Sequence, residues 1–333
     1  MFSIINLFKN KQKEFFLLVL VIGFISRIAV SKLGYQADIE WWVIVNDINT
    51  ANAKFYGTGA IMYTPFWVHT LYILDNIPFF ELEGYNSFRY KIIIFLSLID
   101  IVIFWILTKK YSLLIGIIFF LNPISIFITG FHNQFDNIAV LIGFLAVLSY
   151  EKYKVNGIYF CSLLLGLSLA FKHLLFIFPI WLAIKENKFY RKILVILIPY
   201  SIFALSFIFY LPDQSNEILK DVFGYKSMDN GPFWSIFTPQ FFGSYIGYFN
   251  LFIIAILFLG FFVEERRVLE SFFIYLIAIV TFSSAVANQY LAIPIVAMAV
   301  YWSPYFVLYT IVCTIFFTID HHALDNPEIK EML

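Results

Sequence analysis

Two carboxylates follow the first apolar segment of the chain, in the run Asp38-Ile39-Glu40-Trp41-Trp42. A group transfer onto a hydroxyl needs a base that takes the hydroxyl proton, and a carboxylate suits that role. Two carboxylates separated by one loop residue can divide into a base and a helper, or share a divalent cation. An acidic pair in a loop can equally be a solvated feature. We take Asp38 as the candidate base and Glu40 as its helper, with Asp47 as a second, less favoured candidate for the base.

A second polar cluster, GFHNQFDN at residues 130–137, separates two apolar segments. Its side chains include His132, Gln134 and Asp136, which cannot face lipid and must face protein, water or a ligand. This density of hydrogen-bonding groups suits a sugar or a phosphate. A polar turn between helices is the alternative.

Three basic residues lie where apolar segments begin or end. Lys172 and His173 follow one segment, and Arg89 begins another. A cation at the membrane rim suits a phosphate that must be neutralised. The alternative for Lys172 is a lysine that snorkels from a helix end, and Arg89 has a similar alternative.

The remaining candidates are weaker. Tyr63, in Tyr63-Thr64-Pro65-Phe66, and the pair Gln289-Tyr290 can line a pocket or be interfacial aromatic motifs. Arg27 and Asp100 lie inside apolar segments, where ionisable groups often have a function. Mutual neutralisation within a helix bundle explains that pair better. The C-terminal run Asp320-His321-His322 is weak evidence for a metal site.

The elements that must position these residues are apolar helices. The chain has 333 residues, of which 61% are hydrophobic and 13% charged, against about half and a quarter in soluble domains. This composition predicts a polytopic membrane protein. The formal net charge of zero gives no case for nucleic acid. Cys161 and Cys313 both fall in apolar segments, so we expect no disulfide framework.

A helix that crosses the ~30 Å hydrocarbon core needs roughly 20 residues. Apolar segments predict about eleven such helices, and hence one all-α membrane domain over residues 1–333. The predicted spans are 14–32, 89–108, 112–129, 134–150, 156–171, 173–184, 192–211, 248–263, 271–287, 289–302 and 305–319.

Basic residues in alternate loops set the expected orientation, with the N-terminus in the cytoplasm. The external face then holds residues 33–88, residues 212–247 and the C-terminal tail, together with the candidate site. Residues 62–80 are expected to form interfacial helices broken by Pro65 and Pro78. The basic residues that set this orientation, all expected on the cytoplasmic side, are Lys9, Lys11, Lys13, Lys109, Lys110, Lys152, Lys154, Lys185, Lys188, Arg191, Lys192, Arg266 and Arg267.

With these motifs the chain resembles the GT-C superfamily of polyprenyl-phosphate-sugar-dependent glycosyltransferases. It looks most like the dolichyl-phosphate-glucose glucosyltransferases and the first mannosyltransferase of GPI-anchor synthesis. The resemblance covers residues 27–184 well, so residues 1–190 are expected to be the catalytic module and 191–333 a more variable helical half. The motifs are Asp38-Ile39-Glu40, Tyr63-Thr64-Pro65-Phe66, His132-Asn133-Gln134-Phe135-Asp136-Asn137, Phe171-Lys172-His173-Leu174 and Gln289-Tyr290.

The resemblance implies an inverting hexosyl transfer at the external face of the membrane. It implies that Asp38 is the general base. It implies a donor phosphate held by Lys172, His173 and Arg89, and a sugar site shaped by His132, Gln134 and Asp136. The acceptor would be a glycan, lipid or protein, with no nucleic acid partner.

Two departures from the family pattern matter. Asn133 replaces the aromatic residue usual after the histidine, which leaves the sugar open. Glu40 stands where the mannosyltransferases have Asp, which leaves open a need for Mg²⁺ or Mn²⁺ at Asp38 and Glu40. We expect a bacterial inner membrane as the location; the carrier there would be undecaprenyl phosphate.

Two alternatives belong to other classes. A lipid-linked oligosaccharide flippase or a transporter would have interrupted helices, charges at the membrane midplane and an internal repeat. No repeat is evident. An O-antigen-type polymerase would have basic residues in large external loops, whereas residues 212–247 contain only Lys220 and Lys226.

Overall fold

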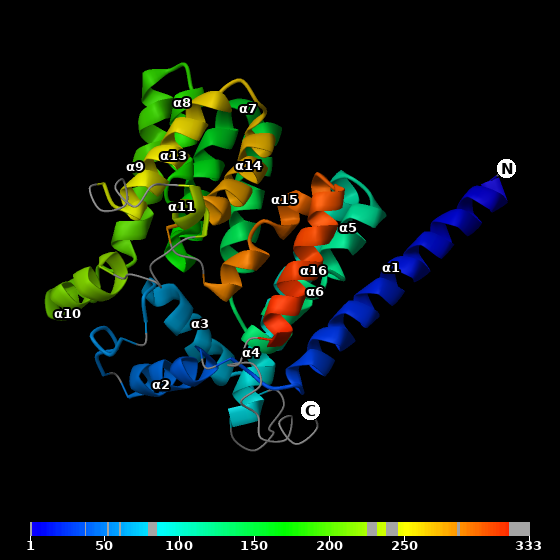
Figure 1. Cartoon of the computed structure of the whole chain (residues 1–333), viewed down its shortest axis with the longest axis horizontal. Coiled ribbons are helices and arrows are strands. Elements are labelled where there is room, and N and C mark those ends of the chain that lie inside the picture. The colour runs from blue at the N-terminus through cyan, green and yellow to red at the C-terminus, as the bar shows by residue number, and fades with distance from the viewer. Residues whose placement is uncertain are drawn as a thin grey trace. The chain divides into compact units, whose positions relative to one another are not determined.

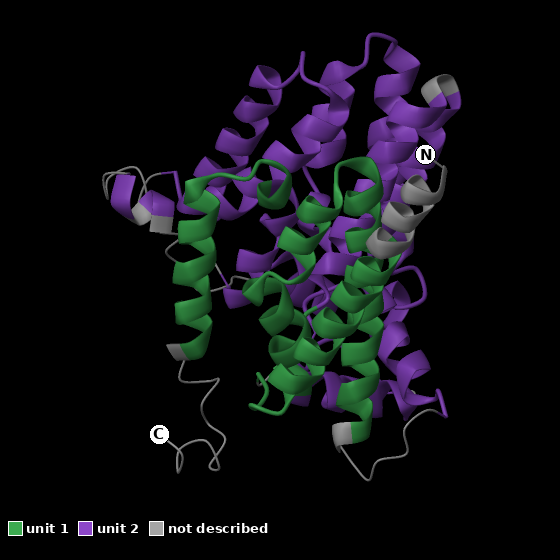
Figure 2. Cartoon of the chain, turned by 90° about the vertical axis from the view of Figure 1, so that its right-hand side faces the viewer, with its two compact units in different colours: residues 1–39, 82–134, 298–333 green, residues 40–81, 135–297 purple. Residues whose placement is uncertain are grey.

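The computed structural model describes residues 2–36, 38–51, 53–59, 61–78, 85–224, 232–237, 246–284 and 287–319. Over these ranges all regular structure is helical, which confirms the all-α prediction (Figure 1). The chain divides into two compact units, each discontinuous in sequence (Figure 2). Unit 1 is Met1–Ile39, Leu82–Gln134 and Met298–Leu333, and unit 2 is Glu40–Glu81 and Phe135–Ala297. These boundaries differ from the expected division at residue 190.

Unit 1 is a bundle of long and broken helices. Its elements are α1 (Phe2–Ser31), α4 (Tyr85–Lys110), α5 (Leu113–Phe120), α6 (Pro123–Phe127), the π-helix η1 (Ile128–His132) and α16 (Pro304–Ile319). The predicted span 112–129 is instead a pair of helices bent by 50°. Asn122 makes the break, because its Oδ1 accepts the Ile124 N–H at 2.9 Å and Pro123 follows as the first helical residue.

Arg27 and Asp100 hold unit 1 together at its centre. Both side chains are fully buried, and Nη2 of Arg27 lies 2.9 Å from Oδ2 of Asp100. Arg27 also donates to Ser125 Oγ at 2.9 Å and to Phe120 O at 3.1 Å, and Thr129 Oγ1 donates to Asp100 at 2.6 Å. A buried ion pair is tolerated when hydrogen bonds satisfy its remaining groups. The expected structural neutralisation is therefore present.

Unit 2 contains the other helices, except that the first two residues of α2 (Asp38–Thr50) and the last three residues of α15 belong to unit 1. Its centre is aromatic: Trp181 packs edge-on against Tyr275 and donates to Ile256 O at 2.9 Å. Its further elements are α3 (Pro65–Asp75), α7 (Asp136–Phe171), the 3-10 turn η2 (His173–Leu175), α8 (Phe178–Lys185), α9 (Phe189–Leu205), α10 (Leu211–Ile218), the π-helix η3 (Leu219–Phe223), α11 (Pro232–Phe237), α13 (Tyr248–Phe262), α14 (Val268–Thr281), the 3-10 turn η4 (Asn288–Ala292) and α15 (Ile295–Val300).

The segment α7 folds back on itself and forms a hairpin of two helical halves. A straight helix of its 36 residues would be about 54 Å long. Yet Ser168 Oγ donates to Ala139 O at 2.8 Å, so the two halves lie side by side. The turn lies near Gly157, where an added Cβ would be 2.6 Å from Ser149 O. This agrees with the prediction of separate segments at 134–150 and 156–171.

Among the residues that the structure describes, two helices are long and apolar enough to cross a membrane, Lys13–Ser31 and Ser87–Lys110. A third is added if the bent pair in unit 1 counts as one span. Each of the other predicted segments also contains a helix, but the described helices are too short to establish about eleven spans. Helix α3 begins at Pro65 and ends before Pro78, as the expected breaks at these prolines require.

Candidate functional site

The predicted site residues divide between the two units. The unit boundary passes between Ile39 and Glu40 and again between Gln134 and Phe135. Unit 1 contains Asp38, Arg89, His132 and Gln134, and unit 2 contains Glu40, Tyr63, Asp136, Lys172, His173, Gln289 and Tyr290. Some of these candidates contact one another within a unit: Asp38 contacts Gln134 in unit 1, and Lys172 contacts Asp136, Tyr63 and Tyr290 in unit 2.

In unit 1, Gln134 holds the candidate base. Its Nε2 donates a hydrogen bond to Oδ2 of Asp38. Gln134 is buried, whereas Asp38 is half-buried at the first position of α2, where the helix dipole favours a carboxylate. Asp38 is therefore an oriented carboxylate with partial access to solvent.

The backbone before Gln134 has an unusual conformation. The π-helix η1 ends at His132 and is followed by Asn133, whose φ of 55° makes it the one positive-φ residue other than glycine in the described ranges. The Gln134 N–H closes this turn by donating to Ile128 O at 3.2 Å. π-Helical turns and left-handed residues are enriched at functional sites. Asparagine tolerates this left-handed conformation better than most residues, so Asn133 suits the end of the turn.

Arg89 fixes this turn. Its Nε donates to Asn133 Oδ1 at 3.0 Å, its Nη1 donates to Ser31 O at 2.9 Å and its Nη2 donates to Gly34 O. The guanidinium is buried, so a phosphate would have to displace these acceptors. Arg89 therefore has a structural role at this turn, and phosphate binding by Arg89 stays a prediction. His132 is also buried, with its ring 5.0 Å from that of Phe317.

In unit 2, Lys172 and Asp136 form an ion pair among aromatic rings. Nζ of Lys172 is 2.7 Å from Oδ2 of Asp136. It also lies 4.7 Å from the ring centroid of Phe135, 4.9 Å from that of Tyr63 and 6.0 Å from that of Tyr290. We call these five residues the lysine cage. Ring faces and a carboxylate here replace the hydration of the ammonium.

Sequence reasoning missed Phe135, although it lies inside the polar run. Its ring stacks on Trp67 at a centroid distance of 4.2 Å, and Trp42 packs edge-on against it at 5.8 Å. An aromatic residue between Gln134 and Asp136 was the available signal. Phe135 forms the buried wall of the cage.

Two buried polar atoms at the cage retain hydrogen-bonding capacity. Oδ1 of Asp136 and Nδ1 of His173 have no hydrogen-bond partner within the described part of the chain. Buried polar atoms normally have partners, so both atoms suit a ligand hydroxyl or an ordered water. Burial, and secondarily the charge of Lys172, lowers the pKa of His173 to about 4. His173 is therefore neutral near pH 7 and offers a phosphate no positive charge.

The structure changes the interpretation of Glu40. Asp38 and Glu40 were expected in a loop, but both lie in α2. Side chains two residues apart on a helix leave it about 200° apart and do not face each other. A cation bridging the pair is thus disfavoured, and Glu40 is exposed.

Within the described residues, no three His, Cys, Asp or Glu side chains are grouped so that they could hold a metal ion. Asp320-His321-His322 lies outside the described residues, as do the rest of the C-terminal tail and positions 225–231 and 238–245 of the expected 212–247 loop. Gln289 lies half-buried in η4 beside Tyr290.

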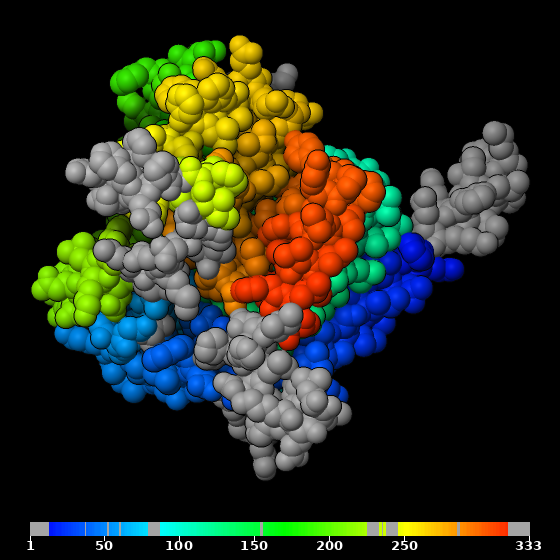
Figure 3. Space-filling view, viewed as in Figure 1, coloured from blue at the N-terminus to red at the C-terminus, as the bar shows by residue number. Residues whose placement is uncertain are grey.

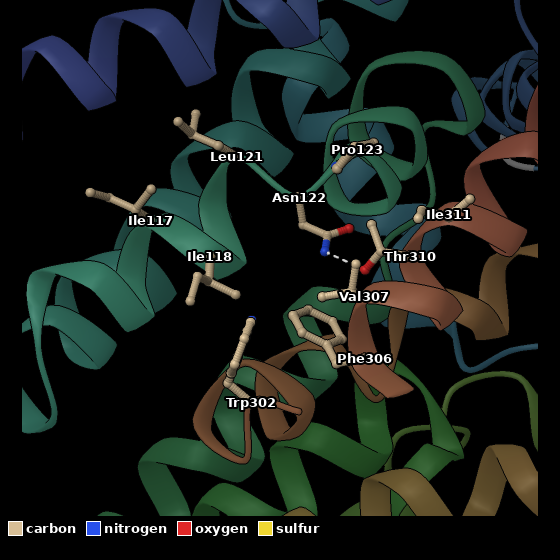
Figure 4. Close-up of a pocket in the computed structure, with 10 residues that line it drawn as sticks. All are labelled: Ile117, Ile118, Leu121, Asn122, Pro123, Trp302, Phe306, Val307, Thr310 and Ile311. Atoms are coloured by element: carbon tan, nitrogen blue, oxygen red, sulfur yellow. Dashed lines mark hydrogen bonds between the residues drawn. The ribbon is translucent and has the colours of Figure 1, made fainter. Parts of the chain in front are cut away.

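Unit 1 also contains an apolar groove, where α16 lies beside α5 in the space-filling view (Figure 3). Its volume is about 310 Å³. Asn122 donates to Thr310 Oγ1 at 3.1 Å across it (Figure 4). These polar side chains pair with each other and leave a mainly hydrocarbon lining, which includes Ile117, Trp302 and Phe306.

Comparisons of the chain with protein-family models, curated proteins and solved structures gave no match.

Proposed function

We propose that the chain is an integral-membrane glycosyltransferase of the GT-C type. It moves a hexose from a polyprenyl-phosphate donor to an acceptor hydroxyl at the external face. The observation that carries the proposal is the half-buried Asp38 carboxylate, oriented by the Gln134 amide. A base held by a second group is the arrangement that general-base catalysis requires.

The proposed reaction is a single displacement. Asp38 takes the proton of the acceptor hydroxyl, and the hydroxyl oxygen forms a bond to the anomeric carbon of the donor sugar. The bond from that carbon to the phosphate oxygen breaks. Polyprenyl phosphate leaves with the electron pair, and the anomeric configuration inverts.

The lysine cage supplies the candidate contacts to the leaving phosphate. Lys172 is its cation, and charge-assisted hydrogen bonds to phosphate are strong. Asp136 Oδ1 and His173 Nδ1 are available to ligand hydroxyls. Tyr63, Gln289 and Tyr290 are proposed to line the same cluster. No step is assigned to a divalent cation, because Asp38 and Glu40 diverge on α2.

Exposed apolar surface supports a membrane location. On α1, Leu17, Val21 and Ile25 are each more than half exposed and lie on one face. Soluble proteins rarely expose such continuous apolar surface. We propose a multi-pass protein with a cytoplasmic N-terminus, in a bacterial inner membrane, whose shorter helices complete the bundle. The apolar groove of unit 1 suits a hydrocarbon chain of a lipid.

The test is to incubate the purified protein with a panel of polyprenyl-phosphate sugars and a lipid extract, and to analyse the products by mass spectrometry. We expect one sugar to be added per acceptor. Asp38→Asn should slow transfer by roughly 10²–10⁴-fold, the usual contribution of a general base. Asp213→Asn, an exposed site on α10, is the matched control. An Asp38→Asn protein as active as this control would refute the assignment.

One observation favours the flippase or transporter alternative. The pair α5 and α6 with η1 is bent by 50° at a short break, and interrupted helices are typical of transporters. Movement of a lipid-linked sugar across proteoliposomes, without transfer to any acceptor, would support this alternative.

A further inference from the structure

The lysine cage is closed in this structure. Lys172 is 2% exposed and Phe135 is fully buried, whereas Tyr63 and Tyr290 are half-buried. The two tyrosines therefore form the outer side of the cage. An anion can reach the ammonium only after one of them moves.

The chain before Tyr63 is held by α10 and η3. The Gly57 N–H donates to Oδ2 of Asp221 at 2.6 Å, and the Tyr56 N–H donates to Oε1 of Gln214 at 3.1 Å. Both acceptor side chains are buried. They come from irregular helix, since Asp221 lies in a π-turn and Gln214 has a non-helical φ of −136°. We call these two hydrogen bonds the latch.

The latch connects to the cage through Tyr56. Its hydroxyl donates to Tyr63 O at 2.9 Å, and the Tyr63 ring packs on Lys172. The next residue, Thr64, donates to Ala170 O, two residues before Lys172. Gly57 and Gly59 have φ values of 90° and 74°, which glycine adopts without strain. The segment therefore bends sharply at the latch and is anchored beyond it at Thr64.

We propose that residues 54–59 and 61–63 form a gate over the lysine cage, and that Asp221 and Gln214 hold it closed as positioning residues. An anionic headgroup reaches Lys172 when the latch opens. The identity of this headgroup rests on the proposed function, under which it is the phosphate of the lipid-linked donor. The gate itself is independent of that function.

Amine acetylation tests the gate without any transfer assay. The full-length protein is treated with a water-soluble acetylating reagent, and Lys172 is quantified by mass spectrometry relative to Lys109, which is exposed and lies outside the gate. Losing both latch hydrogen bonds in Asp221→Ala/Gln214→Ala should raise the relative acetylation of Lys172 by roughly 10- to 100-fold. Asp213→Ala, which removes an exposed carboxylate from α10, should leave it at the wild-type value. Equal acetylation of Lys172 in all three proteins would overturn the gate.

A disulfide that holds the latch closed gives the opposite perturbation. It also tests the gate if the Asp221→Ala/Gln214→Ala protein fails to fold. A Cβ built at Gly57 lies 3.6 Å from Cβ of Glu217, within the range for disulfides. Because the φ of 90° strains a cysteine at position 57, the oxidised protein is compared with the reduced form of the same variant, in which the strain is the same. Oxidised Gly57→Cys/Glu217→Cys should lose Lys172 acetylation and sugar transfer, and a reductant should restore both. Glu217→Cys alone is the control, because the native cysteines are buried.

The two proposals fail in different ways. An oxidised double variant whose Lys172 is acetylated like that of the reduced form would overturn the gate. Absence of transfer by the wild type, with acetylation that follows the latch, would refute the glycosyltransferase proposal and keep the gate.

Discussion

The buried ion pair of Asp136 and Lys172 predicts a large response to single substitutions. Its side chains are 0% and 2% exposed, and the charged atoms are 2.7 Å apart. At an effective dielectric constant of about 20, unit charges at this distance attract by roughly 6 kcal/mol before desolvation is subtracted. Removal of one partner leaves the other charge buried and typically costs about 3–5 kcal/mol. Asp136→Ala should thus raise the unfolding equilibrium constant by roughly 100- to 4,000-fold.

The measurement is the free energy of unfolding of the purified protein in mild detergent. Asp136→Ala and Lys172→Met are compared with the double variant Asp136→Leu/Lys172→Met. Because the double variant retains neither charge, it should recover most of the stability while sugar transfer stays low. Arg267→Ala is the control, since Arg267 pairs with Glu151 at 3.1 Å but is 68% exposed. Such exposed pairs contribute about 0–1 kcal/mol.

Two stability results would refute this reasoning, and one activity result would refute the role of Lys172 in transfer. If Asp136→Ala and Lys172→Met lose no more stability than Arg267→Ala, Asp136 and Lys172 do not form a buried pair of charged groups. A double variant as unstable as the single variants would attribute the loss to packing. Full transfer activity in a stable double variant would remove Lys172 from the proposed mechanism.

Three further predictions concern backbone and charge. Gly130→Ala should destabilise the protein by about 1–3 kcal/mol, because its Cβ would lie 2.4 Å from Arg27 O; normal stability in denaturant titration would refute the contact. Asn133→Val should cost about 1–2 kcal/mol from its left-handed φ, whereas Asn133→Gly should cost less, and thermal unfolding compares the two. Because the folded pKa of His173 is lowered from 6.5 to about 4, its contribution to stability is complete above pH 6.5 and is lost as the pH falls to about 4. Unfolding of wild type and His173→Gln from pH 4 to 7 should therefore diverge as the pH falls, and parallel curves would contradict the assignment.

Hydropathy predicted the positions of helices well. The break at residues 151–155 was predicted because charged residues interrupt two apolar runs, and α7 folds back there. Interior polar residues were also interpreted correctly at Arg27 and Asp100, since a buried charge in a bundle requires a partner. These predictions depend only on the cost of burying polar groups.

Other features depend on geometry that composition does not encode. Asp38 follows the end of the first predicted span at residue 32 and was therefore placed in an external loop, yet α2 begins there. Arg89 has the residue type of a phosphate ligand, but its acceptors are backbone carbonyls and Asn133. The π-turn before Asn133 differs from an α-helix by one residue in hydrogen-bond spacing, which leaves the hydropathy pattern unchanged. The latch pairs residues more than 150 positions apart in sequence.

The hairpin of α7 also bears on the order of folding. Asp136 and Lys172 are 36 positions apart, and the cost of closing a loop rises only slowly with its length. Contacts that are local in sequence form faster than distant ones. The charged pair can form once residue 172 is synthesised, before the rest of the chain exists. Tyr290 arrives more than 100 residues later, so the last wall of the cage is added to a centre already assembled.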